Sequence, residues 1–520
     1  MAGTATCMAL AVLLHVATVV FLVAVRLGRR TPRDGSLPLL GHFHLLRKPY
    51  HVTLAALGTA PLVTLRLGAR RTLLVSTYAA AEECFTTHDV ALAGRPQLLA
   101  GKHVGYGHTT LVWLHYGDRW RNLRRVLVVE LFSAARLAAL AADRRAEAVS
   151  LVRNILRDVS GAPPSPSSSS SCTVITFRPR FFEMVFNVLM RSLTAHRHGA
   201  GGDVARFEHL VEETFAVSGT LGLSDFFPGL WWVDRLRGVE AKTANLAAAH
   251  DAFITDIIDG HKRMRDAGVG DGGKRSTIDV LLRLQESDPK NYTDTVIKGL
   301  VLIILAAGTD TTTVTTEWLM AALLKHPEVF RRVRDEIDAT VGTGRLVEEA
   351  DITNLPYLQC VVKETLRLYP PAPIVPAHEA MEDCTVGGVH VRRGTMVVAN
   401  LYAIHRDAEV WDAPEEFRPE RFLDDVGGAA AATARAVPVL PTLPFGIGRR
   451  RCPGEAMATR IVFMAVAALV QCFDWDAAGA IDMAEGDGLT VPMATPLAAA
   501  CRPREFVHGM LSAASLDEME

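Results

Sequence analysis

Several features that reveal a protein's function are missing from this sequence. The eight cysteines are scattered along 520 residues without a CxxC pair, which argues against a disulfide framework or a zinc site. Net charge is also nearly absent, because 55 lysines and arginines almost balance 57 aspartates and glutamates. No global field would therefore attract nucleic acid. There is no internal repeat, and no glycine-rich dinucleotide loop follows a predicted strand.

The N-terminus holds the longest stretch without charge. Residues 2–25 carry no charged side chain and are followed by Arg26, Arg29, Arg30 and Arg33. This length can span a bilayer, and the basic residues behind it keep the rest of the chain on the cytosolic side. A cleaved signal peptide or a buried core helix are the alternatives. We predict a transmembrane signal anchor over 2–25, a basic linker over 26–50 and one large domain over 51–520.

The remaining pattern predicts a mainly α-helical domain with a small β-rich part, an α+β fold. Two β-rich runs, over 61–67 and 72–76, predict an early hairpin. Strand-like runs at 389–391 and 395–399 are expected to join that hairpin in one small sheet.

Long helices and low-complexity segments fill the other parts of the domain. A helix is expected over 293–325, with Thr293 as its N-cap and Pro327 at the start of the next helix. Another is expected over 354–368. The Pro/Ser tract at 161–171 predicts a solvated loop, and residues 429–436 fit a loop or a short helix.

The strongest chemical signal is a cysteine in a glycine-rich loop before an apolar helical run. The segment from Phe445 to Gly454 reads FGIGRRRCPG and fits the haem-thiolate pattern Phe-x-x-Gly-x-Arg-x-Cys-x-Gly at five positions. Glycines let backbone N–H groups turn toward Cys452, and with the following helix N-terminus they favour the thiolate that iron requires. Arg450 can then meet a haem propionate. A buried cysteine beside a basic run is the alternative.

Two helical segments add to this signal. Glu364 and Arg367 share a helix face, and Arg421 in the later segment FRPERF can complete a buried Glu-Arg-Arg cluster with a structural role. The run AGTDTTT at 307–313 is a poor helix former inside an apolar helix. Threonines that bond back to carbonyls can open a helix, so that Asp310 and Thr311 would hold water and deliver protons to dioxygen. A threonine-rich helix packed in the core is the alternative.

In order and spacing these segments resemble the cytochrome P-450 family, and specifically the plant microsomal A-type enzymes. The resemblance spans nearly the whole chain and also uses WRNLRR at 120–125. The runs CTVGG at 384–388 and WWVD at 231–234 look most like the group with isoflavone hydroxylases and herbicide-metabolising grass enzymes. One departure is that 31–36 lacks the proline-rich hinge that usually follows the anchor.

The resemblance implies the cytochrome P-450 fold around heme b, iron protoporphyrin IX, with 51–520 as the haem-thiolate catalytic domain. Cys452 is the implied metal ligand. The implied cofactor-binding residues are Cys452, Arg450, Trp120, Arg124, His378, Phe445, Gly446 and Gly454. The implied proton-delivery pair is Asp310 with Thr311. The implied substrate-contacting regions are 101–115, 207–219, 301–315, 371–378 and 491–497.

The implied activity is a haem-dependent monooxygenase that inserts one oxygen atom of dioxygen into a small apolar substrate, a plant secondary metabolite or xenobiotic. NADPH–cytochrome P-450 reductase would supply electrons, and nucleic acid is not expected as a partner. Membrane lipid would hold a single-pass anchor in the endoplasmic reticulum, with the catalytic domain in the cytosol.

Two other functions stay open, and the electron donor needs a docking surface. One is a haem-thiolate isomerase or dehydratase acting on peroxides, a class that commonly lacks the helix threonine. The other is a non-catalytic haem-binding membrane protein, which would not consume NADPH with reductase present. For the reductase, we predict docking on the basic residues Arg121, Arg125, Arg449 and Arg451.

Overall fold

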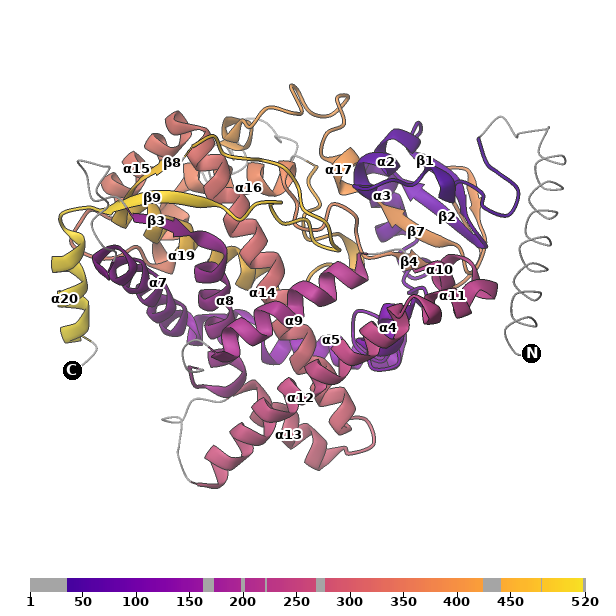
Figure 1. Ribbon diagram of the computed structural model, residues 1–520, viewed down its shortest axis with the longest axis horizontal. Helices are drawn as coiled ribbons and strands as arrows, with labels where there is room; N and C mark the ends of the chain where they lie inside the picture. Colours follow the sequence, from indigo (N-terminus) through magenta and orange to yellow (C-terminus); the bar gives the residue numbers. More distant parts are fainter. Residues whose placement is uncertain are drawn as a thin grey trace, which may run out of the picture.

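Helices form most of the molecule, as the sequence predicts, and two small sheets lie at its opposite ends (Figure 1). The computed structural model describes residues 35–161, 173–197, 202–219, 222–267, 276–423, 441–477 and 479–517. The anchor predicted over 2–25, the first part of the linker, residues 162–171 of the Pro/Ser tract and the segment 429–436 lie outside these residues.

The helices are distributed along the whole described chain. The α-helices are α2 (Tyr50–Leu57), α3 (Tyr78–Glu82), α4 (Leu99–His103), α5 (Asp118–Glu130), α6 (Ala134–Ala139), α7 (Ala141–Gly161), α8 (Phe177–Thr194), α9 (Gly202–Ser218), α10 (Leu223–Phe226), α11 (Trp231–Leu236), α12 (Val239–Asp266), α13 (Thr277–Ser287), α14 (Asp294–Lys325), α15 (Pro327–Thr340), α16 (Pro356–Leu368), α17 (Leu401–Ile404), α19 (Glu455–Cys472) and α20 (Val507–Asp517). The shorter turns are η1 (Phe43–Leu45), the π-helix η2 (Glu83–Thr87), η3 (Pro228–Leu230), η4 (Glu349–Asn354), η5 (Pro419–Phe422) and η7 (Gly448–Arg450).

Three sheets are present in the described residues. Their strands are β1 (Leu62–Leu67), β2 (Arg70–Val75), β3 (Thr173–Thr176), β4 (His378–Glu379), β5 (Cys384–Val386), β6 (Val389–Val391), β7 (Met396–Ala399), β8 (Phe473–Ala477) and β9 (Ala498–Pro503). The orders are β1-β2-β7-β4, β3-β9-β8 and β5-β6.

The early hairpin is confirmed, and the sheet around it differs from the prediction in one strand. β1 pairs antiparallel with β2, and β2 pairs parallel with β7, so the run at 395–399 does join the hairpin. The run at 389–391 does not: β6 pairs with β5 as a separate ribbon. The turn at Gly387 and Gly388, both with positive φ, brings these two short strands together locally. The prediction that β6 belongs to the main sheet is therefore wrong.

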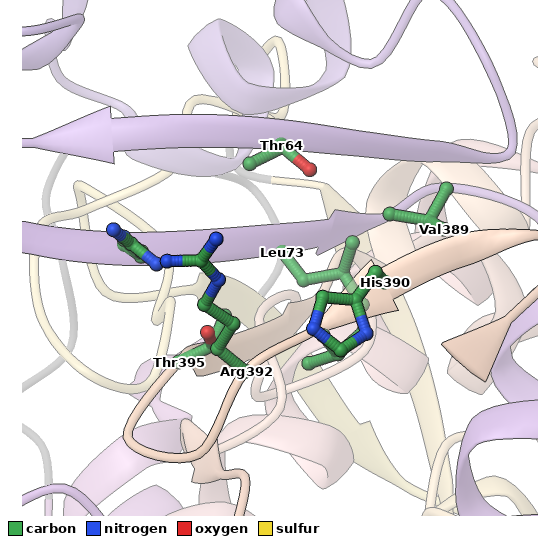
Figure 2. A pocket seen from close by; sticks show the side chains of 8 residues that line it. Thr64, Leu73, Val389, His390, Arg392 and Thr395 are labelled. Atoms are coloured by element: carbon green, nitrogen blue, oxygen red, sulfur yellow. The ribbon is translucent and has the colours of Figure 1, made fainter. Parts of the chain in front are cut away.

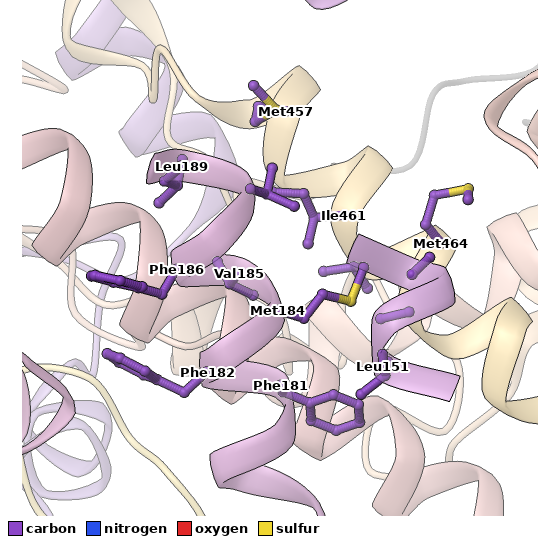
Figure 3. Close-up of a cluster of buried hydrophobic side chains, with 14 of the residues drawn as sticks. Leu151, Phe181, Phe182, Met184, Val185, Phe186, Leu189, Met457, Ile461 and Met464 are labelled. Carbon is purple, nitrogen blue, oxygen red and sulfur yellow. The ribbon is translucent and has the colours of Figure 1, made fainter. Parts of the chain in front are cut away.

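The main core surrounds α14, which crosses the centre of the molecule (Figure 1). Helices α8 and α19 both pack against it. Figure 3 shows how α8 contributes Phe181 and Met184, and how α19 contributes Ile461 and Met464, to one apolar cluster. The helix follows Thr293 and ends before Pro327, as predicted.

Two described helices, α14 and α19, are long and apolar enough to cross a membrane. In their most apolar windows, 56% and 72% of the residues are buried inside the protein. Both also pack against several other helices, since α14 contacts α8, α16 and α19, and α19 contacts α7 and α15. We therefore assign α14 and α19 to the protein core.

Candidate haem-thiolate site

The cysteine loop, residues 445–454, is a tight turn that leads into α19. The N–H of Gly446 donates to the carbonyl of Leu443 at 2.9 Å, and the N–H of Cys452 donates to the carbonyl of Phe445 at 2.8 Å. Gly448 has φ +73°, and a Cβ there would collide with the backbone carbonyl of Phe85. Only glycine combines a positive φ with the absence of a Cβ, and the close packing of the loop against η2 requires both.

The sulfur of Cys452 lies at the N-terminus of α19. Of the six cysteines that the structure describes, only Cys452 is exposed, yet nearby protein atoms still desolvate its thiol. This desolvation raises the pKa of the Cys452 thiol and is the largest effect. Backbone N–H groups of Gly454 and Glu455 and the positive charge of Arg124 lower it. The predicted N–H groups are present, but burial raises the pKa of the thiol more than they lower it. A bound cation would favour the thiolate.

Two arginines flank an indole beside this loop. Arg450 donates from Nε to the carbonyl of Ala93 at 2.8 Å and lies 5.1 Å from the ring centre of Trp120. Arg124 on α5 donates to the carbonyl of Arg451 at 2.5 Å and lies 6.0 Å from the same ring. The indole N–H of buried Trp120 donates to the carbonyl of Leu111 at 3.2 Å. The indole therefore supports the two guanidinium groups by cation–π contact.

A third arginine, which the sequence did not single out, belongs to this group. Arg95 is 7% exposed and donates to the carbonyl of Ala377 at 2.8 Å, while its buried Nε has no hydrogen-bond partner within the described part of the chain. Burial, followed by the charge of Arg450, lowers the pKa of Arg95 well below its usual value. Burial likewise lowers the pKa of Arg450 to about 10. A lone arginine before a proline carries no motif, so no signal in the sequence could have revealed it.

His378 lies beside Arg95 and Arg450 on β4. Its Nδ1 is 2.9 Å from the carbonyl of Leu92, and the ring is 5% exposed. Burial lowers the pKa of His378 well below its usual value, and the charges of Arg95 and Arg450 lower it further. Its imidazole is therefore neutral unless an anion is bound nearby.

These buried and partly buried cations fit the carboxylates of a haem. None of Arg95, Arg124 and Arg450 makes a salt bridge with a carboxylate in the part of the chain that the structure describes. Desolvated guanidinium groups are costly without a counter-charge, and a group with two carboxylates would supply it. The same group brings a metal cation that favours the Cys452 thiolate. The donor set thus fits an iron porphyrin on both counts.

The threonine-rich segment of α14 is regular helix, although its hydroxyls bond back to the main chain as predicted. Thr311 donates from Oγ1 to the carbonyl of Ala307 at 2.6 Å, and Thr309, Thr315 and Thr316 make the corresponding bonds. The helix is not opened by these bonds, because it runs unbroken from Asp294 to Lys325. Ala307 is the only exposed residue between Val296 and Leu324 of this helix, and Thr311 lies one turn further along the same face.

Asp310 faces away from Thr311 toward a loop near the C-terminus. Its Oδ2 accepts a hydrogen bond from the hydroxyl of buried Thr490 at 2.6 Å. Desolvation raises the pKa of Asp310 to about 6, while Thr490 and Arg178 act in the opposite direction. The structure therefore places the two predicted side chains on adjacent positions with different partners. Thr490 was not predicted, since its contact with Asp310 spans 180 residues.

The predicted Glu-Arg-Arg cluster is present, with Glu364 and Arg367 fully buried and the side chain of Arg421 9% exposed. Glu364 accepts two hydrogen bonds from Arg367, at 2.7 and 2.8 Å, and one from Nε of Arg421 at 3.1 Å. The remaining donors of Arg367 reach the main-chain carbonyls of His405, Pro414 and Glu416. The cluster thus joins α16 to the chain that precedes the cysteine loop.

The basic surface predicted for reductase docking is largely neutralised by local partners. Arg121 pairs with Asp118, Arg449 with Asp89 at 2.8 Å, and Arg451 with Glu455 at 2.7 Å. Arg125, in contrast, is exposed, and its partner among the described residues is the neutral side chain of Asn122 at 3.2 Å.

Two cavities of about 310 and 320 Å³ lie away from this site. Figure 2 shows the first, between Thr64 and Leu73 of the main sheet and Val389 and His390 of the β5–β6 ribbon. The second is lined by residues of α4, α11 and α12. Neither is lined by Cys452 or by a residue of α14, so neither belongs to the site described above.

Comparison with known proteins agrees with this geometry. The family model described as cytochrome P-450 matches residues 32–496. Cytochrome P-450 81Q32 of Catharanthus roseus is 40% identical over 97% of each chain. The isoflavone 3'-hydroxylase of Medicago truncatula is 39% identical and covers 92% of this chain and 93% of that protein. The (+)-piperitol/(+)-sesamin synthase of Sesamum radiatum is 37% identical over 92% and 91%.

The fold is also that of a solved structure. A zebra fish cytochrome P-450 structure with progesterone superimposes with a TM-score of 0.72 at 25% identity, covering 88% of this chain and 100% of that chain. Because the family model spans most of its length and plant members share 37% to 40% identity with it, the chain belongs to the cytochrome P-450 family of haem-thiolate monooxygenases.

Proposed function

We propose that the chain uses heme b to hydroxylate a small apolar plant secondary metabolite or xenobiotic. The observation that carries this proposal is exposed Cys452, whose sulfur accepts backbone N–H groups beside three arginines, of which Arg95 is buried and Arg124 and Arg450 are partly buried. When bound, the haem iron activates dioxygen and supplies the oxidising power for insertion of one oxygen atom. Two relatives, named for an isoflavone and for piperitol and sesamin, support a secondary metabolite as substrate.

The residues of the cysteine loop and the buried cations would hold the cofactor. Cys452 is the proposed axial ligand, with Phe445, Gly446 and Gly454 shaping its loop. Arg124, Arg450 and Arg95 are the proposed propionate donors, and Trp120 supports two of them through its ring. His378 can join them only when protonated, since its Nδ1 is already bonded to Leu92.

The face of α14 that carries Ala307 and Thr311, called its open face below, is proposed to deliver protons. The hydroxyl of Thr311 is half-exposed at this face and can exchange its bond to Ala307 for one to water or substrate. Asp310, with a pKa of about 6, can gain and lose a proton near neutral pH. Its surroundings include Arg178, which pairs with buried Glu317 at 2.9 Å and with the exposed Glu212 at 3.6 Å. This ionic group extends from Asp310 toward the protein surface.

The electron donor is proposed to be NADPH–cytochrome P-450 reductase, docking on α5. This helix exposes Arg125 together with Val128 and Val129, which are 40% and 54% exposed. Arg125 keeps its full charge for an acidic partner, and the adjacent valines provide apolar contact area. Charge reversal by Arg125→Glu should slow reduction of the iron, most strongly at low salt. Reduction rates equal to wild type across a salt series would exclude this surface.

Attachment to the endoplasmic reticulum membrane is proposed through the anchor over 2–25. An apolar surface of the described domain supports contact with lipid: Trp231, Trp232 and Leu236 of α11 are 56%, 45% and 79% exposed. Indole rings of this kind favour the membrane–water interface.

The test of the proposed function uses the full-length chain in membranes with coexpressed reductase. We expect the reduced protein with carbon monoxide to show the red-shifted Soret band of a thiolate-ligated haem, and Cys452→Ala to lose it. NADPH should be consumed with formation of hydroxylated product from a metabolite library. A thiolate band without NADPH consumption would favour the isomerase or the non-catalytic protein. Retention of the band in Cys452→Ala would refute the ligand assignment.

A second variant tests proton delivery separately from haem binding. Thr311→Ala should keep the thiolate-type band but divert electrons from product into hydrogen peroxide, because a proton donor is missing from the open face of α14. The ratio of peroxide to product per NADPH is the measurement. An unchanged ratio would show that Thr311 only packs.

A further inference from the structure

His405 is a buried histidine at the junction between the Glu-Arg-Arg cluster and the cysteine loop. It follows α17 directly and has no solvent exposure. Its backbone carbonyl accepts a hydrogen bond from Nη1 of Arg367 at 2.7 Å, and its ring Nδ1 lies 3.1 Å from the carbonyl of Arg367. Arg367 and His405 are thus joined by two hydrogen bonds, because the side chain of each contacts the backbone carbonyl of the other.

The other ring nitrogen contacts the segment that leads into the cysteine loop. The backbone N–H of Leu443 donates to Nε2 of His405 at 2.9 Å. An N–H donor requires an unprotonated nitrogen, so the ring proton must lie on Nδ1, where the carbonyl of Arg367 accepts it. Burial agrees with this neutral form, because it lowers the pKa of His405 to about 3. Both ring nitrogens are therefore satisfied without water.

The bond to Leu443 continues as an ordered path to the sulfur ligand. The carbonyl of Leu443 accepts the N–H of Gly446 at 2.9 Å, and the carbonyl of Phe445 accepts the N–H of Cys452 at 2.8 Å. Leu443 also packs in one apolar cluster with Leu401 and Ile404, the two buried residues of α17. The short helix thus holds Leu443 both by its apolar side chain and by its backbone.

We propose that His405 is a positioning residue that fixes the start of the cysteine loop through its bond to Leu443, and thereby holds Cys452 in place for the haem iron. This rests on the proposed role of Cys452 as the ligand. Arg367 of the Glu-Arg-Arg cluster holds His405 by two hydrogen bonds, and His405 in turn holds the loop by its bond to Leu443. A histidine that merely fills space in the core would need neither of its ring bonds.

The two ring nitrogens can be tested one at a time with amide side chains. In His405→Gln, the amide reaches the position of Nε2 and its oxygen can accept the N–H of Leu443. In His405→Asn, the shorter amide reaches the position of Nδ1 and can donate to Arg367, but the N–H of Leu443 loses its acceptor. The matched controls are His390→Gln and His390→Asn, because His390 is 57% exposed and lies on the β5–β6 ribbon.

The measurement is the rate at which the haem-loaded, full-length protein loses its thiolate-type carbon monoxide band at a fixed urea concentration. A buried N–H without an acceptor should make this loss about tenfold faster or more in His405→Asn. Both controls should stay within about twofold of wild type, and His405→Gln should lie between wild type and His405→Asn, because it loses the bond to the Arg367 carbonyl but keeps an acceptor for the N–H of Leu443. If His405→Asn fails to bind haem while His405→Gln binds it, the proposal is also supported.

Two results would overturn the proposal. One is a rate for His405→Asn equal to wild type. The other is equal impairment of His405→Asn and His405→Gln, including failure of both to bind haem, because restoring the Leu443 bond would then make no difference. Absence of the thiolate-type band in the wild-type protein would instead refute the ligand role of Cys452.

Discussion

Replacing the buried carboxylate of Asp310 by an amide should stabilise the folded protein at neutral pH. Asp310 is 9% exposed, and desolvation raises its pKa to about 6 from the ordinary value of 3.8. The carboxylate is thus easier to ionise in the unfolded chain than in the folded one. Asp310→Asn keeps the shape and an oxygen that accepts the hydroxyl of Thr490, but it never ionises.

The sign and size of the effect follow from the two pKa values. A folded-state pKa above the unfolded one contributes stability below about pH 3.8, and this contribution is lost as the pH rises to about 6. The difference between the two pKa values corresponds to about 3 kcal/mol. A folded-state pKa lower by about one pH unit would correspond to about 1.5 kcal/mol. Asp310→Asn should therefore gain about 1.5 to 3 kcal/mol at pH 7, and little at pH 4.

The assay is urea unfolding of the haem-loaded protein between pH 4.5 and 7.5, followed by far-ultraviolet circular dichroism. The advantage of Asp310→Asn should grow up to about pH 6 and then stay constant. Asp256→Asn is the control, because the Asp256 carboxylate is 75% exposed and should give no such trend. The reasoning fails if Asp310→Asn is no more stable than wild type at pH 7, or if its advantage does not depend on pH. Product formation should fall in the same variant.

Three further predictions concern the cluster, the loop and the anchor. Glu364→Gln removes the carboxylate that pairs with Arg367 and Arg421, so the free energy of unfolding should fall by about 3 to 5 kcal/mol. An unchanged urea midpoint would contradict this. Gly448→Ala should abolish the thiolate-type spectrum because its Cβ meets the Phe85 carbonyl, and a normal spectrum would show that the loop can shift. Deleting residues 2–25 should release much of the protein from sedimented membranes with its haem spectrum intact, whereas loss of haem would place that segment in the core.

Local patterns in the sequence predicted the parts of the structure that local forces determine. The helix Asp294–Lys325, the hairpin β1–β2 and the pair Glu364–Arg367 all depend on neighbours within a few residues. The pairing of β6 with β5 is also local, and the Gly387-Gly388 pair between them is the hairpin signal that could have predicted it; the three-residue strands themselves carry little pattern.

The residues of the site also divide into those placed by local contacts and those placed by long-range contacts. The cysteine loop is a continuous motif, and its hydrogen bonds form among its own residues. Arg95, Thr490 and His405, in contrast, reach the site from distant segments as single polar residues without a motif. Their roles follow from tertiary contacts, which only the folded chain reveals.

The buried carboxylates of α14 also bear on how the chain is made. If the chain is attached to a membrane as proposed above, α14 is synthesised there as a 32-residue, largely apolar segment that resembles a membrane span, before its core partner α19 exists. An aspartate at the centre of a segment costs about 2.5 to 3.5 kcal/mol on insertion. Asp310, with Glu317 two turns further on, would therefore make insertion of α14 into lipid less favourable than its packing in the folding domain. On the proposed membrane attachment, carboxylates that are costly to bury in the finished protein would help to keep α14 out of the membrane while the chain is made.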